Sequence, residues 1–145
     1  MLLAGTNNIG RSPGGEPMVA DITRGLAAIV DRFKQKAPGA TIIVMGILPR
    51  SDGPVKETMS VINGINANLA RMADGKTVRY LDINDRLADA EGNLFEGVTT
   101  DRLHLSLKGY EIWAEALKPI LTELLGPPAE TDTAPPPTGD PSAKR

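Results

Sequence analysis

Thr41-Ile42-Ile43-Val44-Met45-Gly46-Ile47-Leu48 is a continuous apolar run rich in β-branched residues, and Pro49 closes it. Such runs are typical of parallel strands that helices cover on both faces. One helix is expected before this strand in the sequence and another after it. Apolar residues recur at three- and four-residue spacing from Pro17 to about Ala37 and from about Val55 to Ala73. A further strand is expected over Thr77–Ile83.

A last helix is expected over about Leu107–Leu125, with Ser106 as its N-cap and Gly126 as its end. Strands that alternate with helices predict an α/β fold with a parallel sheet and right-handed crossovers. Met1–Ala4 reads as the first of about three strands, or as the end of one, and we interpret the chain as N-terminally truncated because it begins inside an apolar run. The outer edge of that strand would be bare, so self-association through an unpaired strand edge is expected.

Composition narrows the function further. The chain has 145 residues, which suits one domain, and a net charge of −2 with no basic block, which argues against a nucleic-acid partner. It has no cysteine and one histidine, so neither a disulfide framework nor a metal site is expected. No apolar stretch is long enough to span a membrane. Residues 1–125 form the predicted domain, and residues 126–145, with six of the 12 prolines, form a predicted disordered tail.

The sharpest chemical signal is Asp101-x-x-His104 in the loop before the last helix. An imidazole that acts as a general base needs an acceptor for its far N–H, and a carboxylate three residues earlier in a turn can supply one. Asp82 and Asp85, after the third strand, are weaker candidates for the same acid. Taken alone, the pair could also be a loop aspartate and a partly buried polar residue.

A second signal, Gly5-Thr6-Asn7-Asn8, follows the first predicted strand. A glycine N–H and an asparagine amide suit an oxyanion hole, although both residues also favour turns for backbone reasons. Phosphate binding between Gly5 and Gly15 is a rival interpretation, but the loop contains neither a Walker motif nor Gly-x-Gly-x-x-Gly.

Other polar and aromatic residues carry weaker expectations. Arg50 follows the central strand and is a candidate for the substrate pocket, against a solvated loop position. Trp113 is expected in the core, and Asn63 and Asn66 are expected to face solvent or to cap a neighbouring loop.

Three blocks together resemble the SGNH (GDSL-type) hydrolases, in the branch of the platelet-activating-factor acetylhydrolase catalytic subunits. These blocks are Gly5-Thr6-Asn7-Asn8, the strand ending in Leu48-Pro49-Arg50, and the segment from Asp101 to Tyr110. The resemblance runs from Met1 to about Leu125 and implies a flavodoxin-like three-layer α/β/α fold. It also implies a Ser-His-Asp esterase without a cofactor, acting on a small-molecule ester.

Within that resemblance, His104 would be the base, Asp101 its orienting acid, and Gly5 and Asn7 the oxyanion donors. The family's Gly-Asp-Ser nucleophile block does not occur in this sequence, whose serines are Ser12, Ser51, Ser60, Ser106 and Ser142. None follows a strand in the manner of a nucleophile turn, and Ser12 is the least unsuitable substitute. The chain is therefore expected to be inactive by itself. The alternatives are a non-catalytic α/β binding or interaction module and a nucleotide-binding flavodoxin-like module.

Overall fold

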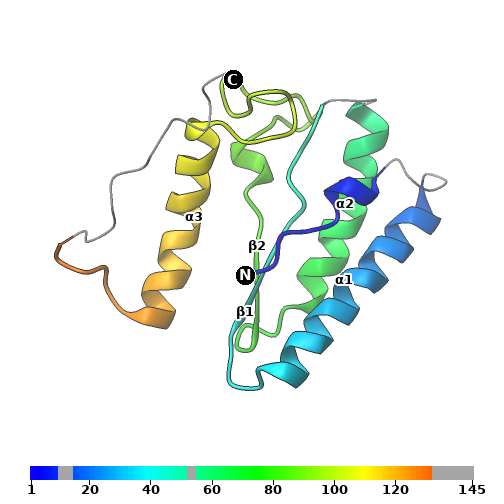
Figure 1. Cartoon of the computed structure of the whole chain (residues 1–145). Coiled ribbons are helices and arrows are strands. Elements are labelled where there is room, and N and C mark those ends of the chain that lie inside the picture. The colour runs from blue at the N-terminus through cyan, green and yellow to red at the C-terminus, as the bar shows by residue number, and fades with distance from the viewer. Residues whose placement is uncertain (10–14, 52–54, 132–145) are drawn as a thin grey trace.

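Two strands and three long helices make up the fold in the computed structural model, which describes residues 1–9, 15–51 and 55–131. In chain order they are α1 (Glu16–Lys36), β1 (Ile42–Met45), α2 (Val55–Met72), β2 (Val78–Leu81) and α3 (Leu107–Leu125). Helices α1 and α2 lie side by side on one face of the strands, and α3 lies on the opposite face (Figure 1). This arrangement confirms the predicted three-layer α/β/α fold.

The strands β1 and β2 are parallel, with Val44 opposite Tyr80. On the other side of β1, Leu2 forms an isolated parallel bridge to Val44: its N–H donates to the Ile43 carbonyl at 2.8 Å and its carbonyl accepts from the Met45 N–H at 2.9 Å. Within the predicted strand over Met1–Ala4, the pairing with β1 is confined to Leu2. Only Leu2 directs both backbone groups toward β1, and Gly5, with a φ of 111°, turns the chain away soon afterwards.

The strand β1 is also shorter than the apolar run that predicted it. The Gly46 N–H still donates to the Leu81 carbonyl at 2.8 Å, which continues the ladder by one bond. Ile47 then leaves the ladder, because its N–H and its carbonyl both bond to the side-chain amide of Asn66 on α2. A side chain thus takes the place of the neighbouring strand at the carboxyl end of β1.

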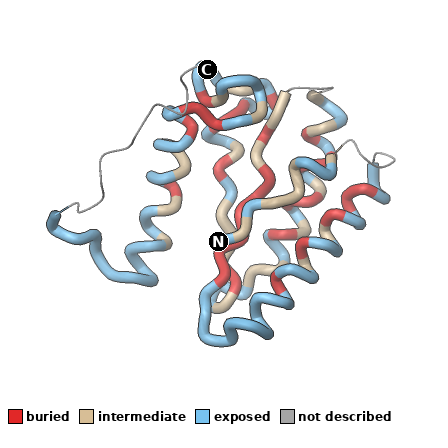
Figure 2. Tube along the Cα trace, viewed as in Figure 1, coloured by how far each residue is buried: buried red, intermediate tan, exposed pale blue. Residues whose placement is uncertain are grey.

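Two apolar clusters, one on each face of the strands, form the core, and the buried stretches follow the strands and the inner sides of the helices (Figure 2). The larger cluster joins α1 and α2 to the sheet and includes Leu26, Val44, Ile62, Ile65, Leu69 and Val78. The smaller one lies toward α3 and consists of Ile83, Leu87, Val98, Leu105 and Ala116. In addition to this cluster, a bidentate ion pair joins α3 to β2. Nη1 and Nη2 of Arg79 donate to Oε1 and Oε2 of Glu123, each at 2.7 Å.

The predicted ends of the helices agree with the structure. Pro17 lies in the first turn of α1, where a missing N–H costs nothing. The Ser106 side chain caps α3 by accepting the Gly109 N–H at 3.2 Å, and Gly126 follows the last helical residue with a φ of 88°. The exposed segment 126–131 begins the predicted tail, of which residues 132–145 lie outside the described part of the chain. No helix within the described residues is long and apolar enough to cross a membrane.

Candidate active site

The loop between β2 and α3 presents Asp101 and His104 on a tight hairpin. Thr99 and Leu105 form an antiparallel bridge, and the Thr100 N–H donates to the His104 carbonyl at 2.9 Å. At the tip Arg102 adopts a φ of 70°, in the left-handed region that side chains other than glycine rarely occupy. This conformation brings two residues that are three apart in the sequence face to face.

The Asp101 carboxylate binds His104 through both of its oxygens. Oδ2 lies 2.6 Å from the His104 Nδ1, while Oδ1 accepts the backbone N–H groups of Leu103 at 3.1 Å and His104 at 2.7 Å. These bonds, first the one from the His104 backbone N–H and then the one from its ring, lower the pKa of Asp101 to about 2. An ionised acceptor at Nδ1 requires the proton to sit on that nitrogen, which leaves Nε2 as the basic nitrogen of a neutral ring.

The competing acids have other partners. Asp82 accepts the Tyr80 hydroxyl at 2.7 Å and the Asn84 N–H at 2.9 Å, so its carboxylate belongs to a separate polar cluster. Asp85 is exposed in the short 3-10 helix Asn84–Arg86. Among the described residues, the carboxylate bonded to the imidazole is that of Asp101. The His104 side chain is 73% exposed, so its ring is open to a reactant.

The second sequence block forms a single 3-10 turn, Thr6–Asn8, immediately after Gly5. The Asn8 N–H donates to the Gly5 carbonyl at 3.0 Å and closes the turn. A Cβ at Gly5 would lie 2.8 Å from Cδ1 of Ile47, so glycine is needed here both for its positive φ and for this close approach. Asn7 is exposed, whereas Gly5 is partly covered.

Arg50 connects the turn to the end of the central strand. Its Nη1 donates to the Thr6 carbonyl at 3.0 Å and to the Thr6 hydroxyl at 3.2 Å, which makes it a brace for the turn. The next residue, Ser51, donates its N–H to the Arg102 carbonyl at 3.0 Å. Three segments that are distant in the sequence are therefore joined at one rim of the molecule, at the carboxyl ends of the strands.

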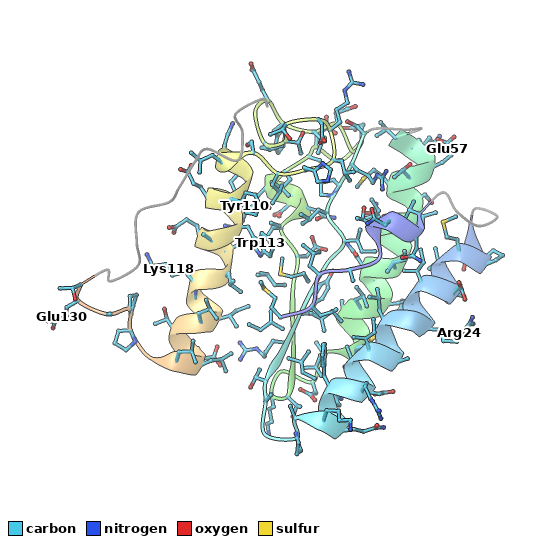
Figure 3. The ribbon with its side chains drawn as sticks, in the orientation of Figure 1. Arg24, Glu57, Tyr110, Trp113, Lys118 and Glu130 are labelled. Carbon is cyan, nitrogen blue, oxygen red and sulfur yellow. The ribbon has the colours of Figure 1, made fainter. Side chains whose placement is uncertain are left out.

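A pocket of about 310 Å³ opens between the turn and the His104 loop, and its wall includes Thr6, Asn7 and His104. Its apolar wall includes Tyr110 and Trp113 of α3, whose rings stack with centroids 5.9 Å apart. Figure 3 shows both side chains on the side of α3 that faces the strands. Trp113 packs against the smaller core cluster, as predicted, and it also forms part of the pocket.

Neither Ser60 nor Ser106 has the setting of a nucleophile. Ser106 is buried, and its hydroxyl is occupied by the Gly97 carbonyl and the Gly109 N–H. Ser60 is exposed on α2, while Ser12 and Ser142 lie outside the described residues. Among the described side chains, no three His, Asp or Glu groups are arranged to hold a metal ion.

Of the two settings predicted for Asn66, exposure to solvent is wrong, and the residue bonds instead to the backbone of the segment that follows β1. It is 5% exposed and bonds to the Ile47 backbone, whereas Asn63 is exposed as predicted. The signal was present in the sequence, because Asn66 falls at the i+4 position of the apolar series that begins at Ile62 and continues to Leu69. A polar residue on the buried face of a helix needs a polar partner inside.

Comparison with known proteins agrees with this architecture. Residues 1–112 match the GDSL-like Lipase/Acylhydrolase family. The platelet-activating factor acetylhydrolase IB subunit alpha1 of Homo sapiens is 30% identical over 123 residues, and the alpha2 subunit of Mus musculus is 29% identical over 124 residues. Each match covers 83% of this chain and 50% of the relative, so the chain spans about half the length of these relatives.

Solved structures show the same likeness. A Streptococcus pneumonia protein described as a platelet activating factor superposes with a TM-score of 0.66 at 29% identity, covering 82% of this chain and 57% of the other. A Bacteroides fragilis protein described as an acylhydrolase gives 0.70 at 19% identity, covering 85% and 60%, which is a likeness of fold. With more than half of its length matched by the family, the chain belongs to the GDSL-like lipase/acylhydrolases.

Proposed function

We propose that this chain carries the acid–base and oxyanion-binding part of an ester hydrolase that works by a Ser-His-Asp mechanism. The observation that carries the proposal is the 2.6 Å contact between His104 Nδ1 and Asp101 Oδ2, at the rim of a pocket that Asn7 also lines. The family's description as acylhydrolases and the name acetylhydrolase of the relatives support a short acyl ester as the substrate.

In the proposed reaction, a serine oxygen attacks the ester carbonyl while Nε2 of His104 takes the hydroxyl proton. Asp101 holds the Nδ1–H and stabilises the imidazolium that forms. The Gly5 N–H and the Asn7 amide donate to the tetrahedral oxyanion, where one donor contributes roughly 3–4 kcal/mol to lowering the barrier. His104 then protonates the leaving alcohol, and a water molecule hydrolyses the acyl-enzyme by the reverse sequence of proton transfers.

The nucleophile in this proposal is not one of the chain's own serines. Gly-Asp-Ser is absent from the 145 residues, and among the described residues neither Ser51 nor Ser60 is hydrogen-bonded to the imidazole. By itself the chain therefore hydrolyses no short acyl ester, although it holds a general base and candidate oxyanion donors. Arg50 has the role of a brace for the oxyanion turn, and we propose that it affects the substrate pocket through that turn.

The test compares two proteins in p-nitrophenyl acetate hydrolysis. The first is the 145-residue chain, for which we expect a rate equal to that of its His104→Ala variant. The second is the same chain preceded by a segment with a Gly-Asp-Ser strand, taken from a relative. We expect this protein to hydrolyse the ester and to lose about 10⁶-fold in kcat when His104 is replaced by alanine.

Two results would contradict the proposal. Hydrolysis by the 145-residue chain that His104→Ala abolishes would mean that one of its own serines is the nucleophile. A folded, extended protein with no His104-dependent hydrolysis would favour the alternative of a non-catalytic α/β binding module. Stabilisation of the chain by phosphate ligands on heating would instead favour the nucleotide-binding alternative.

A further inference from the structure

The Asn66 carboxamide bonds to both backbone groups of Ile47, just beyond the end of β1. Its Oδ1 accepts the Ile47 N–H at 2.7 Å, and its Nδ2 donates to the Ile47 carbonyl at 3.0 Å. Asn66 is 5% exposed, and Ile47 is 1% exposed, so both bonds lie away from water. The bond from the Ile47 N–H fixes the backbone firmly, because breaking it leaves a buried donor unsatisfied.

The surroundings hold the carboxamide itself in place. Its Nδ2 lies 3.4 Å from Oδ2 of Asp82, and that oxygen also accepts the Tyr80 hydroxyl. A Cβ on the adjacent Gly46 would come within 2.9 Å of the Asn66 Nδ2, the Asp82 carboxylate and the Tyr80 hydroxyl alike. The polar cluster is therefore packed directly against the glycine backbone.

Ile47 is in direct contact with the candidate site. The Ile47 side chain lies beneath Gly5, where its Cδ1 would be 2.8 Å from a Cβ at that residue. Ile47 and Leu48 both line the pocket that contains His104 and Asn7. A shift of the Ile47 peptide would thus move the support of the turn that presents the oxyanion donors.

We propose that Asn66 is a positioning residue of this site, which acts through Ile47 to hold the Gly5–Asn7 turn in place. The inference rests on the proposed function for its catalytic meaning, but its geometry is testable without any activity. An amide fulfils the role because it supplies both an acceptor for the Ile47 N–H and a donor for the Ile47 carbonyl, which also accepts from Nδ2 of Asn84 at 3.0 Å. Alanine supplies neither, and an ionised carboxylate supplies only the acceptor.

Hydrogen–deuterium exchange of the 145-residue chain, followed by mass spectrometry at low micromolar concentration, tests the inference. In Asn66→Ala we expect the amides of residues 1–9 and 46–51 to exchange about tenfold faster. This ratio corresponds to a decrease of about 1.4 kcal/mol in the free energy of local opening. Peptides from α3 should be unchanged. The matched control is Asn68→Ala on the same helix, which loses the 3.2 Å bond to the Thr23 hydroxyl and should leave residues 1–9 as they were.

A conservative variant separates positioning from a general loss of stability. In Asn66→Asp the protonated carboxyl has both an O–H donor and a carbonyl acceptor, whereas the ionised form lacks the donor and faces Asp82. We therefore expect exchange in residues 1–9 close to that of the unchanged protein near pH 4 and close to that of Asn66→Ala near pH 7, each compared at the same pH. Asp82, whose Oδ2 lies 3.4 Å from the Asn66 Nδ2, and Tyr80, whose hydroxyl donates to that oxygen, are ionisable groups beside this position.

The inference is overturned if Asn66→Ala leaves residues 1–9 unchanged, or if exchange rises equally in every peptide, α3 included. It is also overturned if Asn66→Asp matches Asn66→Ala at both pH values. These outcomes are distinguishable from a failure of the proposed function. An extended protein without His104-dependent ester hydrolysis would leave the exchange pattern, and hence the coupling of Asn66 to the turn, intact.

Discussion

The side chain and the backbone of His104 hold the same carboxylate, that of Asp101. The backbone N–H donates to Oδ1 at 2.7 Å, and the ring Nδ1 lies 2.6 Å from Oδ2. The main chain of the hairpin therefore holds the Asp101 carboxylate independently of the bond from the imidazole. This relationship makes the two contributions to the pKa of Asp101 separable by mutation.

Replacing His104 by alanine should raise the pKa of Asp101 only part of the way from about 2 toward its ordinary value of 3.8. The substitution removes the ring but keeps the backbone donor, which is the larger cause of the shift. Carboxyl NMR titration of both proteins measures the two pKa values directly. A full return to 3.8 in His104→Ala would show that the backbone bonds do not hold in solution.

The lowered pKa also sets the sign of a pH effect on the hairpin. A carboxyl whose pKa is lower in the folded state stabilises that state above its unfolded pKa, and the contribution is lost as the pH falls through the folded pKa. We expect the backbone amides of Leu103 and His104 to stay protected above about pH 4 and to lose protection between about pH 4 and pH 2. In Asp101→Asn the same protection should show no such transition, as amide exchange across this range would reveal.

Two glycine-to-alanine substitutions should change stability in opposite directions. At Gly46 the new Cβ would meet three polar atoms at 2.9 Å, so we expect a loss of about 1–3 kcal/mol in the free energy of unfolding. At Gly25, inside α1, no atom lies within 4 Å of the new Cβ, and alanine should stabilise the protein by about 0.5–1 kcal/mol. Urea unfolding measures both, and a stable Gly46→Ala variant would contradict the packing of the Asn66 cluster.

The cap of α3 offers a fourth test. Ser106 is 7% exposed, accepts the Gly109 N–H at 3.2 Å, and donates to the Gly97 carbonyl. Ser106→Ala should lower the free energy of unfolding by about 1–2 kcal/mol, because the helix loses its cap and a carbonyl loses its donor. Ser60→Ala, on the exposed side of α2, is the matched control and should change the free energy by less than about 0.5 kcal/mol. Equal effects in thermal melts would show that Ser106 does not cap the helix.

The layers of the fold were predictable because they depend on local patterns. The apolar run at Thr41–Leu48 and the helical periodicity that ends at Leu69 specify which faces are buried, and burial alone determines the layering. The Asp101-x-x-His104 contact was predictable for the same reason, since both residues lie in one short turn. Local spacing contains all the information that these features need.

The features that could not be predicted depend on contacts between distant segments. Ile47 leaves the β ladder because Asn66, 19 residues later, takes its backbone groups, and no local pattern around Ile47 signals this. The Arg79–Glu123 pair joins residues 44 apart, and each looks like an ordinary surface charge in the sequence. The hydrogen bond from Arg50 to the Thr6 carbonyl similarly forms only when the fold brings the strand and the turn together.

The edge of the sheet at Leu2 supports a prediction about association. Leu2 turns its N–H and carbonyl toward β1, so the backbone groups of Leu3 point the other way, where no described strand pairs with them. The Leu3 side chain is 38% exposed and Met1 is 62% exposed, which adds apolar surface to this edge. Unpaired edges with exposed apolar residues favour pairing with another chain.

We expect the 145-residue chain to self-associate with rising concentration, and Leu3→Lys to reduce that association by placing a charge on the edge. Ala20→Lys, at an exposed position of α1, adds the same charge elsewhere and should leave the association unchanged. Sedimentation velocity over a series of concentrations compares the three proteins. A monodisperse monomer at every concentration would contradict the open edge, and it is also the behaviour that a self-contained binding module would show. Equal effects of the two lysines would mean that net charge, rather than strand pairing at Leu3, governs the association.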